Sequence, residues 1–104
     1  MPIEQNKDFH GGQITLETWS PGVVAGNSTS DQQFTAGVAG SWLPTDVVMV
    51  LPPAGPAVGW QAGLALDGAF VVSADLISVR FVNCTAGALV PQAGSVYTVV
   101  VFRR

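Results

Sequence analysis

Charged side chains are scarce in this sequence. They make up 11% of its 104 residues, whereas an average soluble domain carries about a quarter. Lys and Arg number 4 against 7 for Asp and Glu, and the formal charge of −3 has the wrong sign for binding a phosphate backbone, so we expect no nucleic-acid partner. Because so little charge is available to cover a lone monomer, and hydrophobic residues reach 48%, we expect apolar surface that meets other protein.

Cysteine and histidine occur once each, as Cys84 and His10. A single cysteine excludes an intramolecular disulfide, and a single histidine excludes a site built from several His and Cys ligands, so we expect no metal and no cofactor. We expect Cys84 to pack in the interior as a small hydrophobic residue. The aspartates lack the alternating spacing of a calcium loop and fall at loops or strand edges; they are Asp31, Asp46, Asp67 and Asp75.

Long hydrophobic runs and catalytic motifs are also lacking. No apolar run approaches the roughly 18 residues of a membrane-spanning helix, and residues 1–10 contain no apolar core of a signal peptide, so we expect no membrane partner. The sequence holds no Gly-x-Ser-x-Gly motif, and nothing in it brings two carboxylates together, so we expect a protein that is not an enzyme. The length fits one domain.

Residues 1–12 are mostly polar and end in Gly11-Gly12. This composition predicts an extended N-terminal arm without a core of its own, followed by a folded domain over residues 13–104. Ile3 and Phe9 are apolar enough to anchor such an arm on a neighbouring subunit. A frayed terminus is the alternative.

Apolar residues that alternate with period two, bounded by Gly, Pro and Asp turns, predict strands in the rest of the chain. The predicted strands cover 13–19, 46–51, 58–66, 69–73, 76–82 and 95–102. Asp67-Gly68 lies between two of them and predicts a tight hairpin, and residues 26–31 have the composition of a loop. No window shows a helical period, so we expect an all-β domain: a single β-sandwich of jelly-roll or immunoglobulin-like type.

Flat aromatic side chains are the residues best suited to bind a sugar or anchor a protein interface. They are Trp19, Trp42, Trp60 and Tyr97, and packing in the core is the alternative for all four. Arg80 and Arg103 form a second candidate group, either at a solvated strand edge or docked on an acidic neighbour. These six residues, with Ile3 and Phe9, are the candidate oligomer or partner interface.

Several motifs between about Phe34 and Phe102 resemble a group of small bacteriophage virion proteins. They are Leu43-Pro44-Thr45-Asp46-Val47-Val48, Pro52-Pro53, the run Val79-Arg80-Phe81-Val82-Asn83-Cys84-Thr85-Ala86-Gly87, then Pro91 and Gly94-Ser95-Val96-Tyr97-Thr98-Val99. In that group, a strand, a double proline, a strand, a valine-rich strand ending in Asn-x-Thr, a proline turn and a last strand recur in this order.

The resemblance implies a capsid decoration, or cement, protein. Such a protein is made in the host cytoplasm, binds the outside of an icosahedral head, commonly as a homotrimer, and clamps neighbouring major capsid proteins. Three rival classes stay open: a tail-fibre or baseplate module that binds a receptor or carbohydrate, a small hydrolase, and an immunoglobulin-like module of a larger protein.

Overall fold

The computed structural model describes residues 12–53 and 60–103 and contains only strands as regular elements in those ranges. The expected all-β class is therefore confirmed. The strands are β1 (Gly12–Trp19), β2 (Ser28–Thr35), β3 (Val47–Leu51), β4 (Leu64–Ser73), β5 (Leu76–Asn83) and β6 (Ser95–Phe102). Gly12, which the sequence assigns to the arm, begins β1. The remainder of the predicted arm, with Ile3 and Phe9, lies outside the described residues.

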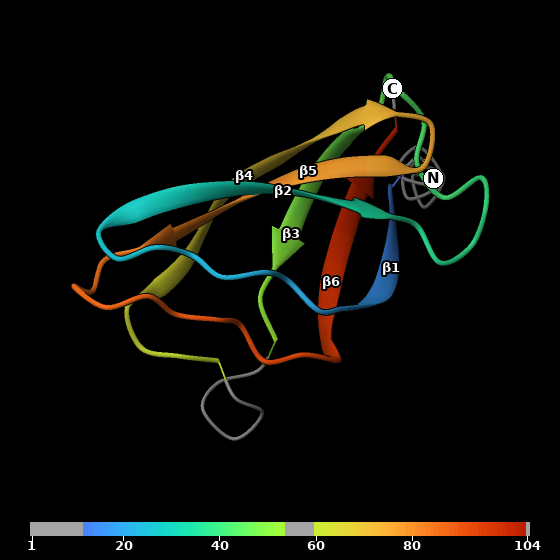
Figure 1. Cartoon of the computed structure of the whole chain (residues 1–104). Helices are drawn as coiled ribbons and strands as arrows, with labels where there is room; N and C mark the ends of the chain where they lie inside the picture. The colour runs from blue at the N-terminus through green and yellow to red at the C-terminus, as the bar shows by residue number, and fades with distance from the viewer. Residues whose placement is uncertain (1–11, 54–59, 104) are drawn as a thin grey trace, which may run out of the picture.

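Two antiparallel sheets of three strands each pack against one another. One has the order β1-β6-β3 and the other the order β2-β5-β4, and their strands cross in the view of Figure 1. Strands β2, β3 and β4 each lie in the sheet opposite to the strand before them, and β3 lies beside β4 where the two sheets meet. The fold is thus a two-layer arrangement with one core.

Two of the connections that cross between the sheets run side by side. Residues 20–27 join β1 to β2, residues 84–94 join β5 to β6, and Val24 and Leu89 exchange backbone hydrogen bonds of 2.7 and 3.0 Å. The Asn27 amide also donates to the Thr85 carbonyl at 2.7 Å. Because β1 pairs with β6 and β2 pairs with β5, these bonds continue one antiparallel ribbon from the first sheet into the second (Figure 1).

Aromatic rings from both sheets fill the centre of the core. Trp19 of β1 stacks on Phe34 of β2 with ring centroids 4.2 Å apart, and on Tyr97 of β6 at 5.0 Å. Phe81 of β5 meets Tyr97 edge-on at 6.4 Å. Aliphatic residues surround the rings, because every second residue of β3, β5 and β6 points inward; those fully or nearly buried include Val48, Val50, Ile77, Val79, Val99 and Val101.

The predicted hairpin at Asp67-Gly68 is wrong. Leu66 and Ala69 pair not with each other but with Phe81 and Val79 of β5, so two residues of β4 oppose one of β5 and form a bulge. Gly68 has φ +112°, a conformation that glycine adopts without steric cost. The hairpin turn instead lies at Ala74-Asp75, between β4 and β5.

Two strand limits also differ from the prediction. Residues 28–31, which the sequence assigns to a loop, form the first half of β2 because β5 supplies a complete partner strand for them. The start of the next predicted strand, 58–66, differs as well: β4 begins only at Leu64, after a turn at Ala62-Gly63.

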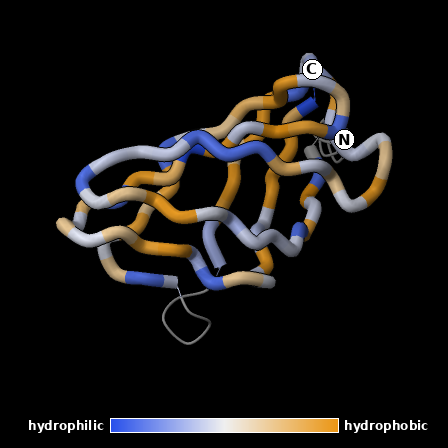
Figure 2. Tube along the Cα trace, in the orientation of Figure 1, coloured by the Kyte–Doolittle hydropathy of each residue, from blue (hydrophilic) through white to orange (hydrophobic). Residues whose placement is uncertain are grey.

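Hydropathy along the chain follows the two layers. Strands β3 and β6 are hydrophobic almost throughout, whereas β2 carries a hydrophilic stretch (Figure 2).

Candidate protein interaction surface

The outward side of the sheet β1-β6-β3 is built from apolar side chains. Along each strand, residues of this outward side alternate with buried residues, because successive side chains point to opposite faces of the sheet. We call this surface the apolar face; its members are Ile14 and Leu16 of β1, Val96, Val100 and Phe102 of β6, and Val47, Met49 and Leu51 of β3. Thr18 and Thr98 are its polar members, and none of its residues is charged.

The strand register arranges these side chains in rows across the sheet. Ile14, Val100 and Met49 form one row, and the next contains Leu16, Thr98 and Leu51. Ile14 and Leu16 are 66% and 68% exposed. Taking about 150–250 Å² for a fully exposed large side chain, the seven exposed members of the apolar face leave on the order of 700 Å² uncovered, which is near or above the upper end of the roughly 300–600 Å² of the largest patch on a typical monomer.

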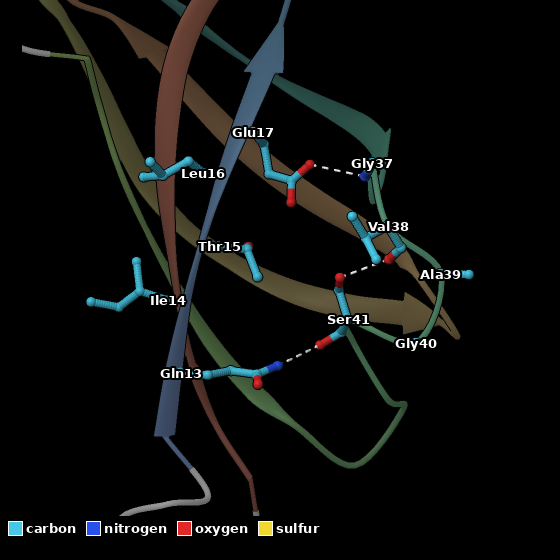
Figure 3. Close-up of a pocket in the computed structure, with 10 residues that line it drawn as sticks. All are labelled: Gln13, Ile14, Thr15, Leu16, Glu17, Gly37, Val38, Ala39, Gly40 and Ser41. Carbon is cyan, nitrogen blue, oxygen red and sulfur yellow. Dashed lines mark hydrogen bonds between the residues drawn. The ribbon is translucent and has the colours of Figure 1, made fainter.

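The loop of residues 37–41 fixes β1 from the side away from this face (Figure 3). Gln13 donates from Nε2 to the Ser41 carbonyl at 3.1 Å, and Glu17 accepts the Gly37 amide at 3.0 Å. Figure 3 shows Ile14 and Leu16 pointing the opposite way, and a hollow of about 440 Å³ lies between β1 and the loop. Gln13 and Glu17 therefore hold β1 against the loop, while Ile14 and Leu16 stay outside.

Two buried or half-buried aspartates position the rest of the loop. Asp46, whose side chain is fully buried, accepts hydrogen bonds from Arg103 at 2.9 and 3.0 Å and from the Leu43 amide at 2.8 Å. The hydrogen bond from Arg103 lowers the pKa of Asp46. Asp75 accepts the amides of Gly40 and Trp42, which lower its pKa. Together they anchor the segment that leads into β3.

The outward side of the other sheet has a different chemistry. Arg80 of β5 donates to both oxygens of Asp31 of β2 at 2.8 and 3.1 Å, and this hydrogen bonding lowers the pKa of Asp31. Phe70 of β4 is 62% exposed beside them. With Asp67 and Ser78, these residues line a hollow of about 260 Å³, so this face combines charge, hydroxyl and one exposed ring.

The aromatic candidates from the sequence lie in the core. Trp42 and Tyr97 are 0% exposed and Trp19 is 6% exposed. Trp60 is half-buried and donates from Nε1 to the Leu64 carbonyl at 3.1 Å. The structure thus brings Trp19, Trp60 and Tyr97 together as packing partners, with the Trp60 and Tyr97 centroids 6.1 Å apart.

The two arginine candidates do not form one site. Arg80 pairs with Asp31 on the outside of β5, whereas Arg103 follows β6 and pairs with Asp46. Ile3 and Phe9 lie outside the described residues.

Cys84 is exposed, so the expectation of a packed cysteine is wrong. Strand β5 ends at the preceding residue, Asn83, whose side chain is buried and takes the inward position.

Asn83 shows that the Asn-x-Thr motif acts as turn chemistry. Its Nδ2 donates to the carbonyls of Val24 and Gly87 at 3.0 and 2.9 Å, and its Oδ1 accepts the Thr85 amide at 2.8 Å. This side chain therefore joins the end of β5 to the neighbouring crossing connection.

Neither a metal site nor a membrane-spanning helix is found in the described part of the chain. Residues 12–53 and 60–103 contain no group of three or more His, Cys, Asp or Glu side chains placed to hold a metal ion. No helix long and apolar enough to cross a bilayer occurs in these ranges either. Comparisons of the chain with protein-family models, curated proteins and solved structures found no match.

The apolar face is the feature that the choice of candidate residues missed. A signal for it is present in the sequence, because β3 and β6 are apolar at both alternating sets of positions and β1 carries Ile14 and Leu16 two residues apart. Two apolar sets predict burial on both sides of a sheet. The candidates were chosen for their aromatic side chains, and these belong to the set of strand residues that closes the core. The other set, which is mainly aliphatic, lies on the outside.

Proposed function

We propose that this protein is a capsid decoration protein of a bacteriophage. It binds the outer surface of the icosahedral head as a homo-oligomer, with a trimer expected, and stabilises contacts between major capsid proteins. The observation that carries the proposal is the apolar face, because a small domain with this much uncharged exposed surface is suited to permanent contact with protein. The protein acts by binding and mass action on the assembled shell, not by catalysis.

The order of elements supports the family resemblance that led to this proposal. Pro52-Pro53 follows β3, β5 ends at Asn83 with Thr85 two residues later, and Pro91 precedes β6. These are the places that the strand, double-proline and Asn-x-Thr pattern assigns to them. The predicted N-terminal arm is part of the proposal, as a strap that contacts a neighbouring subunit.

The proposal includes a jelly-roll for the finer fold type. A jelly-roll is a long antiparallel ribbon rolled into two sheets, and here β1 pairs with β6, β2 pairs with β5, and β3 lies beside β4. An immunoglobulin-like fold keeps its first two strands as neighbours in one sheet, whereas β1 and β2 belong to different sheets. The rolled ribbon therefore supports the jelly-roll over the immunoglobulin type.

Binding to heads is the direct test. The purified chain is mixed with expanded heads assembled from the major capsid protein of the same phage genome and sedimented, and the melting temperature of the heads is measured with and without it. We expect saturable co-sedimentation and a higher melting temperature. Absence of the protein from the sedimented heads, at concentrations where it is folded and soluble, would overturn the proposal.

A tail-fibre or baseplate module that binds a carbohydrate is the second candidate. It is favoured by the hollow beside Phe70, where an exposed ring adjoins Asp67 and the Asp31–Arg80 pair, because sugars stack on aromatic rings and hydrogen-bond to charged groups. A glycan array separates the two candidates. Binding to glycans that Phe70→Ala abolishes, without affinity for heads, would place the second candidate first.

A further inference from the structure

We infer that the apolar face of the sheet β1-β6-β3 is the surface through which copies of this chain bind one another. This inference rests on the proposed function for its biological context. It adds which partner covers the apolar face, namely another copy of the same chain.

The chemistry of the face admits only an apolar partner. Apart from the hydroxyls of Thr18 and Thr98, the outward residues of the three strands offer no polar side-chain atom and no charge. A partner that placed a charged group here would bury it without a counter-charge, which is costly. The occupant must therefore present a comparably uncharged surface.

A second copy meets this requirement with the same face. Elsewhere on the described surface, the outer side of the opposite sheet carries Asp31, Asp67 and Arg80 beside the exposed Phe70. This charged and mixed surface suits an uncharged sheet face less well than a second apolar face does. Two or three apolar faces brought together bury aliphatic side chains on both sides and oppose no like charges. Sheet faces pack in this way at a separation of about 10 Å.

The size of the face also matches an interface between subunits. It leaves on the order of 700 Å² uncovered per protomer, and stable specific complexes bury about 800 Å² on each partner. The face is continuous, since the register joins Ile14, Val100 and Met49 in one row across all three strands. The loop of residues 37–41 holds β1 from the other side, so the face is already formed in the single protomer.

The test is the native molar mass of the purified chain, measured by light scattering in the absence of any capsid. We expect a dimer or trimer at micromolar concentration for the wild-type chain. Leu16→Glu places a charge within the contact, on the edge strand β1, so we expect the dissociation constant of the oligomer to rise at least about a hundredfold. Met49→Lys does the same from β3 and does not depend on β1.

Val38→Glu is the matched control. Val38 is 72% exposed, close to the 68% of Leu16, but lies in the loop of residues 37–41 and not on the face. Circular dichroism checks that each variant is folded. A monomeric wild-type chain, or an oligomer that the two face variants weaken no more than Val38→Glu does, would overturn the inference.

This outcome is separable from that of the proposed function. An oligomer that depends on Leu16 and Met49 but does not bind heads supports this inference and overturns capsid decoration. A wild-type monomer that binds heads overturns this inference and supports the decoration role.

Discussion

Tyr97 brings a polar atom into the centre of the core. Its hydroxyl is buried and has no hydrogen-bond partner among residues 12–53 and 60–103, while its ring packs on Trp19, Trp60 and Phe81. Burial raises the pKa of Tyr97 to about 12. The ring thus contributes packing, and the hydroxyl carries a desolvation cost that nothing in the described structure offsets.

Tyr97→Phe is therefore expected to stabilise the protein. Removing an unpaired buried hydroxyl while keeping the ring recovers about 1 kcal/mol of the free energy of unfolding, measured by urea denaturation. Tyr97→Leu, which removes the ring contacts as well, is the comparison and is expected to destabilise the protein. Loss of stability in Tyr97→Phe would show that the hydroxyl makes a favourable contact.

The titration of Tyr97 gives a second expectation at this scale. Because the folded pKa of about 12 lies above the ordinary value near 10, the unfolded chain releases the phenol proton first as pH rises. The free energy of unfolding is therefore expected to fall between about pH 10 and pH 12, and less so in Tyr97→Phe. Tyr97 is the one tyrosine of the chain, so ultraviolet absorbance reports it directly.

Asp46 is expected to make the protein sensitive to acid. Its folded pKa is lowered, chiefly by Arg103, so the stability that it contributes is complete above the unfolded value near 4 and is lost as pH falls through the folded pKa. Asp46→Asn is expected to reduce stability at neutral pH by about 2 kcal/mol and to flatten its decline below pH 4. Asp67→Asn, at an exposed position of the bulge, is the control, and equal acid slopes in the two variants would contradict the assignment.

At the scale of the elements, the connections of residues 20–27 and 84–94 lie in close contact. A Cβ added at Gly26 would collide with the backbone of Ala86. Gly26→Ala is therefore expected to separate residues 20–27 from 84–94 and to cost more than about 2 kcal/mol of stability. Thermal denaturation measures this loss.

Gly87→Ala provides the control for Gly26→Ala, because a Cβ there meets nothing within 4 Å. Its effect is expected to stay within about 0.5 kcal/mol. Similar melting temperatures for both variants would show that the two connections are not tightly packed.

The sequence predicted strands well where both alternating sets of residues are apolar. The limits of β6 agree with the prediction and those of β3 differ by one residue, because Pro52 and the turn before Ser95 stop the ladder at defined points. The hairpin predicted at Asp67-Gly68 is wrong because turn propensity reflects only local sequence. Tertiary contacts instead pair Leu66 and Ala69 with β5. The sequence also contains the polar pattern of β2, but not the partner strand that makes residues 28–31 extended.

The sequence predicted that apolar surface is exposed, but not where it lies. Low charge and two apolar sets of strand residues indicated such a surface, and contact with another protein stays a prediction. Nothing in one sequence says which of the two sets closes the core. The choice depends on how the sheets pair: β6 turns Tyr97 toward Trp19 and Phe81, and this leaves Val100 and Phe102 on the outside. Exposed Cys84 has the same cause, since Asn83 takes the inward position.

At the scale of the whole molecule, association through an uncharged face is expected to depend little on ionic strength. Salt weakens interactions between exposed charges, and the apolar face has none. The dissociation constant of the oligomer is therefore expected to change less than about threefold between about 0.05 and 0.5 M sodium chloride. Analytical ultracentrifugation measures it, and a steep weakening with salt would indicate an interface made of ion pairs such as Asp31–Arg80.

The ribbon that joins the sheets also determines how this chain must fold. Gly12 pairs with Phe102, and Ile14 pairs with Val100, so the sheet that carries the apolar face closes only when nearly the full length of the chain has come together. Loop closure over such a distance is slow, and proteins rich in non-local pairs fold in milliseconds to seconds. The hairpin turn at Ala74-Asp75 joins strands that are adjacent in sequence, so its closure costs the least entropy. We expect pairing to spread from this hairpin to β2 and to form the sheet β1-β6-β3 last. A nascent chain therefore cannot complete its contact surface before its last strand is available.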